Sequence, residues 1–170
     1  LTVEDGFLVL EGAWFDVDYL NEVLNSLPPA IKNELRIYEE PRLDFDYVIG
    51  CDPSWCTGGD HAVACVMSEQ GRVVAVLASN AGGEDLFSEK LSDLARKYRA
   101  RVLCEANTGG AGRVVIKALL RENVSIWKSD KGQDWITHRG NKEMAYSWSR
   151  QMVNADVFDI TDHTIIQEMM

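Results

Sequence analysis

The order of apolar and amphipathic segments in this chain predicts an α/β fold with a mixed sheet flanked by helices. Three β-rich runs come first, at residues 47–51, 61–67 and 72–79. The last two are joined by Ser68-Glu-Gln-Gly71, a sequence typical of a hairpin turn. From residue 84 onward helical and strand patterns alternate, as they do where strands pair in parallel through helical crossovers. The sequence therefore predicts three antiparallel strands, then parallel strands, with helices packed against the sheet.

The later segments supply the covering helices and further strands. Residues 84–98 have an acidic first turn, a basic last turn and one apolar face, formed by Leu86, Phe87, Leu91, Leu94, Ala95 and Tyr98. Short strands are expected at 101–105 and 124–127, and helices at 112–120 and 142–153. Thr161 or Asp162 can cap a last helix.

The first 44 residues differ from the rest of the chain. Apolar residues recur there at helical spacing, at Val17, Leu20, Leu24 and Leu27. The pair Pro28-Pro29 ends this helix, and a polar connector follows. Residues 1–44 are therefore expected to form an arm or the tail of a preceding domain, and residues 45–170 the compact domain. Because the chain starts with Leu1 and not with Met, it is expected to be an excised fragment.

Composition indicates one globular domain of the cytoplasm. A hydrophobic content of 46% in 170 residues is enough for a core. No stretch approaches the roughly 18 consecutive apolar residues of a membrane span, and no signal peptide opens the chain. The four cysteines show neither C-x-x-C pairs nor His-rich zinc spacing, so reduced thiols are expected.

The formal net charge of -10 argues against strong DNA binding by this chain alone. Metal ions would neutralise acids gathered at a metal site, however, and the basic residues are clustered. One cluster consists of Arg96, Lys97, Arg99 and Arg101, and the other of Lys128, Lys131, Arg139 and Lys142. We expect the second cluster to steer a phosphate backbone, with weak DNA affinity overall and partners that supply the rest.

Two acidic residues directly follow apolar runs. Asp52 ends the run at 47–51 and precedes a Pro/Ser/Gly turn, and Glu105 follows Val102-Leu-Cys104. Carboxylates at the ends of neighbouring strands are suited to hold hard cations such as Mg²⁺ and Mn²⁺. Simpler interpretations exist, because Asp52 can open a turn before a proline and Glu105 can form a salt bridge near a sheet edge.

Other residues near these acids are ambiguous. Asp60 is either an additional metal ligand or a capped turn residue. Asn107 and three glycines, Gly109, Gly110 and Gly112, open a helix whose N-terminus favours a phosphate, although a tight turn alone explains the glycines. Trp55 lies inside the acidic turn and can stack on a base or pack in the core.

The two acidic motifs together resemble the nuclease domain of the large terminase subunit of tailed bacteriophages, which has a ribonuclease H-like fold. The motifs are Asp52-Pro-Ser-Trp-Cys-Thr-Gly-Gly-Asp60 and Leu103-Cys-Glu105-Ala-Asn-Thr-Gly-Gly110. Two flanking segments are similar too. Glu11-Gly-Ala-Trp-Phe15 resembles the connection between the ATPase and nuclease domains, and His138-Arg-Gly-Asn-Lys142 resembles the region after the second acid. No Walker-type phosphate loop is present, so the ATPase itself is not part of this sequence.

The resemblance implies a metal-dependent endonuclease that cuts concatemeric double-stranded viral DNA by two-metal hydrolysis. Asp52 and Glu105 match the first two metal-binding acids, and Asp60 matches a supplementary acid. Two Mg²⁺ or Mn²⁺ ions roughly 3.5–4 Å apart would activate a water and stabilise the departing 3′ oxygen. Asp52 would bridge both ions, Glu105 would hold one, and Asp60 would position a ligand water.

The resemblance also implies partners and a departure from the family. The third acid of the family is expected beyond Met170, with Asp156, Asp159 and Asp162 as available substitutes. Cys56 stands in a turn where a glycine would be easier. Double-stranded DNA, the terminase small subunit, the portal protein and the preceding ATPase domain are the implied partners, in the host cytoplasm.

Two other interpretations remain. Another ribonuclease H-like nuclease, such as a Holliday-junction resolvase or a transposase core, would use the same acids. An actin-like nucleotide-binding module would use the turn at 52–59 to cradle ATP phosphates, but that interpretation leaves Glu105 without a role.

Overall fold

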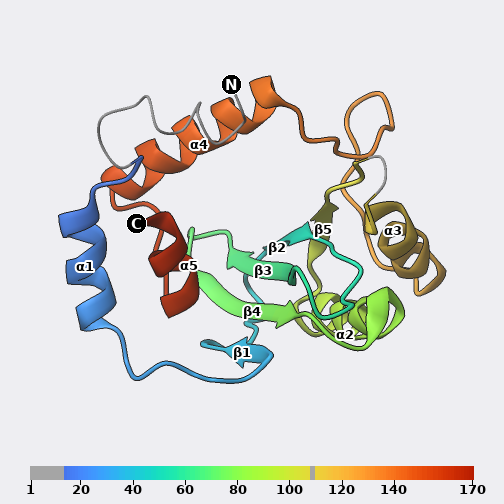
Figure 1. Ribbon diagram of the computed structural model, residues 1–170, viewed down its shortest axis with the longest axis horizontal. Coiled ribbons are helices and arrows are strands. Elements are labelled where there is room, and N and C mark those ends of the chain that lie inside the picture. The colour runs from blue at the N-terminus through green and yellow to red at the C-terminus, as the bar shows by residue number, and fades with distance from the viewer. Residues whose placement is uncertain (1–13, 108–109) are drawn as a thin grey trace.

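Residues 14–107 and 110–170 are described by the computed structural model in Figure 1. The strands are β1 (Leu35–Ile37), β2 (Tyr47–Asp52), β3 (Ala62–Ser68), β4 (Val73–Ser79) and β5 (Arg101–Cys104). The helices are α1 (Val17–Ser26), α2 (Gly83–Tyr98), α3 (Gly112–Arg121), α4 (Arg139–Asn154) and α5 (His163–Met169). Part of the segment 11–15 and the pair Thr108-Gly109 lie outside the described residues. None of the described helices is long and apolar enough to cross a membrane.

The sheet has the order β1-β4-β3-β2-β5. β2, β3 and β4 pair antiparallel, with the predicted hairpin turn between β3 and β4, and β5 pairs parallel with β2. The predicted mixed sheet flanked by helices is therefore confirmed. β1 pairs antiparallel with β4 at the opposite edge. The sequence does not predict this strand, because three residues are too few to show a period.

The strand predicted at 124–127 is reduced to a single parallel bridge between Ile126 and Val102. Two backbone hydrogen bonds flank the bridge: the Val102 N–H donates to the Ser125 carbonyl at 2.9 Å, and the Trp127 N–H donates to the Val102 carbonyl at 2.8 Å. The pairing stops there because the chain enters a polar turn, which the Gly132 N–H closes on Ser129.

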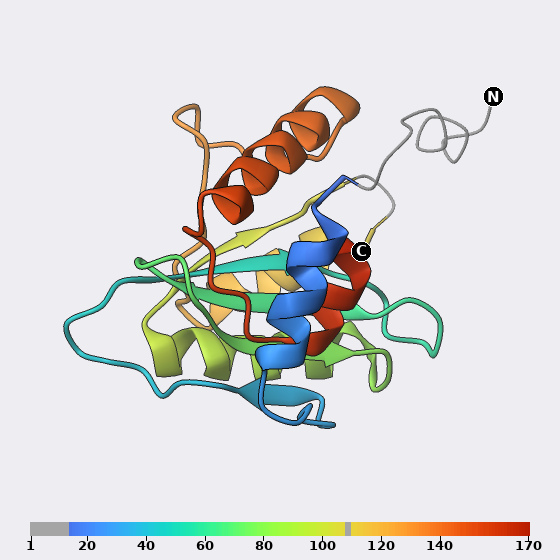
Figure 2. The ribbon, with the colours of Figure 1, turned by 90° about the vertical axis from the view of Figure 1, so that its left-hand side faces the viewer.

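The larger hydrophobic core lies between the sheet and helices α2 and α3. β2 alternates strictly along its length, with Tyr47, Ile49 and Cys51 buried in this core. The predicted apolar face of α2 is buried with one exception, Leu86, which is 39% exposed and places its Cδ2 against Gly82. Figure 2 shows α2 on one side of the sheet and α4 on the other.

A second, smaller core joins α1, α5 and the end of α4. Its buried members are Phe15, Leu20, Val153, Ile160 and Ile166. Helices α1 and α5 contact each other and lie side by side in Figure 1 and Figure 2. Residues before position 45 thus contribute a helix to this core and a strand to the sheet, while the domain boundary at residue 45 stays a prediction.

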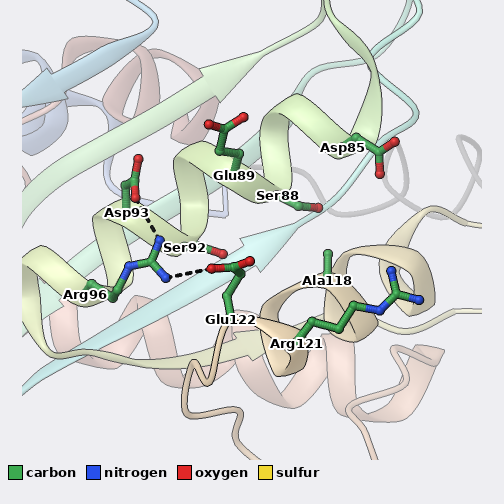
Figure 3. A pocket seen from close by; sticks show the side chains of 9 residues that line it. All are labelled: Asp85, Ser88, Glu89, Ser92, Asp93, Arg96, Ala118, Arg121 and Glu122. Carbon is green, nitrogen blue, oxygen red and sulfur yellow. Dashed lines mark hydrogen bonds and ion pairs between the residues drawn. The ribbon is translucent and has the colours of Figure 1, made fainter.

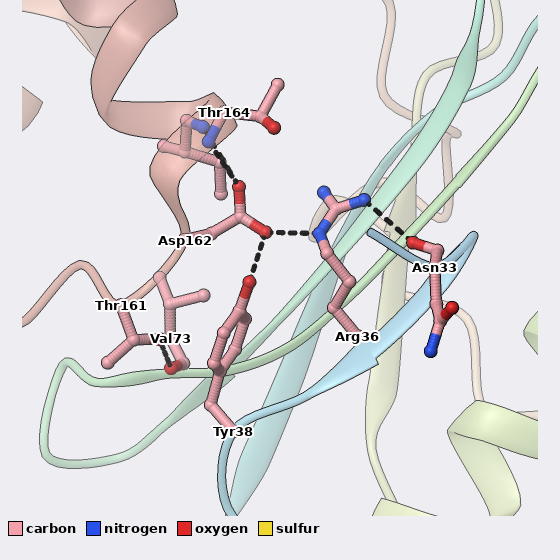
Figure 4. A network of polar contacts seen from close by, with 8 residues as sticks. Asn33, Arg36, Tyr38, Val73, Thr161, Asp162 and Thr164 are labelled. Atoms are coloured by element: carbon pink, nitrogen blue, oxygen red, sulfur yellow. Dashed lines mark hydrogen bonds and ion pairs between the residues drawn. The ribbon is translucent and has the colours of Figure 1, made fainter. Parts of the chain in front are cut away.

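A buried carboxylate, Asp162, connects α5 to the β1 edge of the sheet (Figure 4). Its Oδ2 accepts hydrogen bonds from Arg36 Nε at 2.6 Å and from the Tyr38 hydroxyl at 2.7 Å. Its Oδ1 caps α5 by accepting from the backbone N–H groups of Thr164 and Ile165 at 2.9 and 3.0 Å. The predicted cap at Asp162 is therefore confirmed, and both of its oxygens are used.

These contacts set the ionisation of Asp162. Burial acts to raise the pKa of Asp162, but hydrogen bonds from Arg36, Tyr38 and the Ile165 N–H outweigh burial and lower this pKa below its ordinary value. Burial and the Asp162 carboxylate together raise the pKa of Tyr38 to about 12. The network is therefore ionised at Asp162 and protonated at Tyr38 at neutral pH.

We expect Asp162→Ala to lower the free energy of unfolding by about 3–5 kcal/mol, because it leaves the buried Arg36 charge without its partner. Urea denaturation at pH 7 measures this loss. The control is Asp159→Ala, which removes the exposed ion pair with Arg72 and should change stability by only about 0–1 kcal/mol. Equal losses in the two variants would contradict the assigned role of Asp162.

The stabilisation by Asp162 should also disappear in acid. Because the pKa of Asp162 is lower in the folded chain, its contribution is complete above the unfolded value of about 3.9 and is lost as the pH falls below that value. The difference in Tm between the parent and Asp162→Ala should therefore shrink below about pH 4. A difference that stayed constant to the acid unfolding limit would count against this prediction.

Candidate functional site

The parallel pairing of β2 and β5 brings the two sequence-predicted acids together. Cys51 pairs with Cys104 in the ladder, and the Glu105 N–H donates to the Cys51 carbonyl at 3.0 Å. One step further along the same register Asp52 lies beside Glu105. Successive side chains of a strand point to opposite faces. The two carboxylates therefore lie on the face opposite the α2–α3 core, which contains Cys51 and Cys104.

The electrostatic state of Asp52 reflects this arrangement. Partial burial, and after it the charge and hydrogen bonding of the Glu105 carboxyl group, raise the pKa of Asp52 above its ordinary value. Lys142 acts in the opposite direction, and Asp60 adds weakly to the rise. The two carboxyl groups are close enough to share a proton. A bound cation would reduce the repulsion between them when both are ionised.

The thiols next to these acids are on the other side of the sheet. Cys51 and Cys104 are buried free cysteines. A hydrogen bond with Cys104, together with burial, raises the pKa of Cys51 well above its ordinary value. Both thiols are thus part of the core and not of the surface that carries the carboxylates.

The sheet surface beside Asp52 is open. Val48 and Gly50 occupy the outward positions of β2 before Asp52, and Val48 is 55% exposed. A Cβ atom built on Gly50 would meet nothing within 4 Å. The sheet surface next to Asp52 is therefore accessible to solvent at Val48 and Gly50.

The turn between β2 and β3 holds Asp60 near this surface. The Ser54 hydroxyl donates to the Asp60 carbonyl at 2.7 Å, and the Asp60 side chain is exposed. Cys56 adopts a left-handed conformation with φ 50°, which explains why a glycine would be easier there. Trp55 in the same turn is 44% exposed and is not part of either core.

Sequence reasoning missed the part that Asn107 plays. The Asn107 amide donates to Glu105 Oε1 at 2.5 Å. The sequence contained a signal for this contact, because position 107 follows Glu105 by two residues and so lies on the same face if the extended chain continues.

Glycine is required at position 112, because a Cβ there would stand 1.8 Å from the Glu105 carbonyl oxygen. Only glycine lets the start of α3 approach this strand end so closely.

The four basic residues predicted to steer DNA differ in their surroundings. Lys142, on the first turn of α4, is the one whose charge acts on Asp52. Lys128 is paired with Asp134, and Arg139 with Glu143 at 2.8 Å, whereas Lys131 is exposed in the turn after residue 129. Of the four, Lys142 acts electrostatically on Asp52, and the other three lie along the segment that leads to it.

The donor set fits a hard divalent cation. Among residues 14–107 and 110–170 no group of three His, Cys, Asp or Glu side chains is placed to hold a metal ion. Mg²⁺ is commonly bound by one or two carboxylates, with water and phosphate oxygens completing its coordination. The three acids considered as substitutes for a third metal ligand form other contacts. Asp156 is hydrogen-bonded to Tyr19, and Asp159 and Asp162 form ion pairs with Arg72 and Arg36, respectively.

A cavity of about 420 Å³ lies away from this site, between α2 and α3 (Figure 3). Its lining includes Arg96, which forms ion pairs with Asp93 at 2.9 Å and with Glu122 at 3.1 Å. Neither Asp52 nor Glu105 lines this cavity. This cavity is therefore separate from the carboxylate pair.

The fold is similar to solved nuclease domains of phages. The large terminase nuclease from thermophilic phage G20c with bound cobalt has a TM-score of 0.71 at 21% identity, over 93% of this chain and 80% of that chain. The same nuclease with bound magnesium has a TM-score of 0.71 at 21% identity, over 94% of this chain and 79% of that chain. This chain has the terminase nuclease fold. The large terminase nuclease domain of Thermus phage P74-26 has a TM-score of 0.67 at 18% identity, over 88% of this chain and 76% of that chain.

The comparisons confirm the predicted ribonuclease H-like architecture and the resemblance to terminase nuclease domains at the level of the fold. No family model matches the chain, and no curated protein matches it. In this terminase nuclease fold, Asp52 is the last residue of β2, and Glu105 directly follows β5, the strand that pairs in parallel with β2.

We expect Asp52→Asn to raise the Tm of the metal-free chain at pH 7. A pKa raised in the folded state means that the stability of the parent is highest below the unfolded pKa and falls as the pH rises through the folded pKa. The amide removes this repulsion at neutral pH, so the gain over the parent should vanish toward about pH 4. Thermal unfolding in EDTA measures it, with Asp130→Asn, which changes an exposed acid in the turn that starts at residue 129, as the control. A lower Tm for Asp52→Asn at pH 7 would refute the prediction.

Proposed function

We propose that this chain is the metal-dependent endonuclease domain of a viral DNA-packaging terminase and that it cleaves concatemeric double-stranded DNA. The observation that carries the proposal is the pairing of Asp52 with Glu105 at the ends of parallel strands, on an open sheet surface. Support comes from the shared fold of the terminase nucleases, which were solved with bound cobalt, magnesium and zinc.

Asp52 and Glu105 would hold Mg²⁺ or Mn²⁺, in a site for two ions. Bound divalent cations supply Lewis acidity and a water of lowered pKa to phosphodiester hydrolysis. Asp52 would contribute to holding both ions, and Glu105 would hold one of them and orient the attacking water. Asp60, exposed in the neighbouring turn, would accept a hydrogen bond from a ligand water.

Lys142 would contact the phosphate nearest to the carboxylates, and Lys128, Lys131 and Arg139 would contact the backbone further along. Contacts of this kind carry little sequence information, so cleavage would be largely independent of sequence. The net charge of -10 makes weak DNA affinity the expectation for the chain alone. The small subunit, the portal protein and an ATPase domain would supply the remaining affinity, in the host cytoplasm.

Glu105→Gln and Asp52→Asn are each expected to reduce metal-dependent nicking of supercoiled plasmid by at least about 100-fold, because each removes a charged ligand. Asp85→Asn, an exposed acid on α2, is the matched control and should leave the rate unchanged. The assay uses the protein with Mg²⁺ or Mn²⁺, and gel electrophoresis separates nicked from supercoiled DNA. Unchanged nicking by either site variant would overturn the proposal.

Two further assays on the same protein distinguish the terminase nuclease from a resolvase and from a nucleotide-binding module. A resolvase would cut four-way junctions in preference to linear duplexes, whereas a terminase nuclease should cut both at similar rates. Binding of ATP by this chain in the absence of DNA would favour the nucleotide-binding module instead. Calorimetric titration with ATP tests that outcome directly.

A further inference from the structure

The Asn107 side chain is held in one orientation by a neighbouring loop. The Thr137 backbone N–H donates to Asn107 Oδ1 at 2.8 Å, and the Thr137 carbonyl accepts from Asn107 Nδ2 at 3.3 Å. A backbone N–H can pair only with an acceptor, so the amide oxygen must face Thr137. The amide nitrogen is then left to face Glu105, to whose Oε1 it donates at 2.5 Å.

This orientation suits the ionised form of Glu105. A glutamate side chain has several rotatable bonds, and the register of β2 and β5 sets Glu105 beside Asp52, whose carboxylate repels it when both are charged. A donor fixed at Oε1 opposes rotation of the Glu105 side chain away from Asp52.

The loop that holds Asn107 is itself attached to the strand end. The Ala106 N–H donates to the Trp135 carbonyl at 2.8 Å, and Glu105 forms a parallel bridge with Trp135. The Trp135 indole N–H donates to the Thr137 hydroxyl at 3.1 Å. Thr137 is followed by the capping residue of α4, so the support of Glu105 and the start of the helix that carries Lys142 share one anchor.

We propose that Asn107 is a positioning residue, which fixes the Glu105 carboxylate toward Asp52 so that the pair is preorganised to bind a divalent cation. This inference rests on the metal role of Glu105 in the proposed function. Groups that orient the ligands of a metal commonly change metal affinity or activity by 10- to 100-fold when they are removed. Asn107 acts through Glu105 and does not itself contact the ion.

The test measures Mn²⁺ binding to the full chain without DNA by isothermal titration calorimetry. We expect Asn107→Ala to raise the Kd for Mn²⁺ about tenfold. The matched control is Thr137→Ala, which loses the contact with the Trp135 indole but keeps the backbone groups that hold Asn107. Its Kd should equal that of the parent. Asn107→Gln retains an amide donor and should bind Mn²⁺ with an affinity between those of the parent and Asn107→Ala.

A second measurement separates positioning from a general structural effect. The plasmid nicking rate of Asn107→Ala should approach the parent rate at saturating Mn²⁺, while the Mn²⁺ concentration for half-maximal rate rises about tenfold. Equal Kd values for Asn107→Ala and the parent, or the same weakening in Thr137→Ala, would overturn the inference and leave the proposed function standing. Absence of Mn²⁺ binding by the parent would overturn both.

Discussion

The register between β2 and β5 is the constraint on which the site depends. The parallel ladder aligns residues 48–51 with residues 101–104, and its next step sets Asp52 beside Glu105. A shift of one residue would turn one of the two side chains into the core, because successive residues point to opposite faces. The burial of Ile49, Cys51 and Val102 under α2 and α3 fixes this register, so the same packing that forms the core also aligns the acids.

Repulsion between the two carboxylates opposes this alignment when no cation is bound. Partial burial and then the neighbouring Glu105 carboxyl group raise the pKa of Asp52, and the Lys142 charge compensates only in part. The surrounding contacts hold the acids in place: Gly112 packs on the backbone of Glu105, and Asn107 bonds to its side chain. The remote network at Asp162 supplies stability at the other edge of the sheet, where a fully paired carboxylate has its pKa lowered.

The sequence carried enough information for the sheet and for the two acids, because alternation in β2 and β5 is governed by local burial. The sequence was less informative where pairing with a distant segment decides whether a run of residues forms a strand. Three residues at Leu35–Ile37 become a strand only because β4 offers an open edge, and the run at 124–127 pairs only around Val102. The orientation of Asn107 depends on the Thr137 backbone, thirty positions away, which no local pattern encodes. Leu86 fits the helical period but lies at the border of the buried stripe, where periodicity alone does not decide exposure.

The position of Cys51 and Cys104 has a chemical consequence for the surface above them. Sulfur and oxygen donors are adjacent along each strand, yet the pleat sends the thiols inward and the carboxylates outward. With its pKa raised by Cys104 and by burial, Cys51 stays protonated and is a poor ligand for soft metals. The sheet therefore separates these two thiols from the two carboxylates, which present hard oxygen donors to ions arriving from solvent.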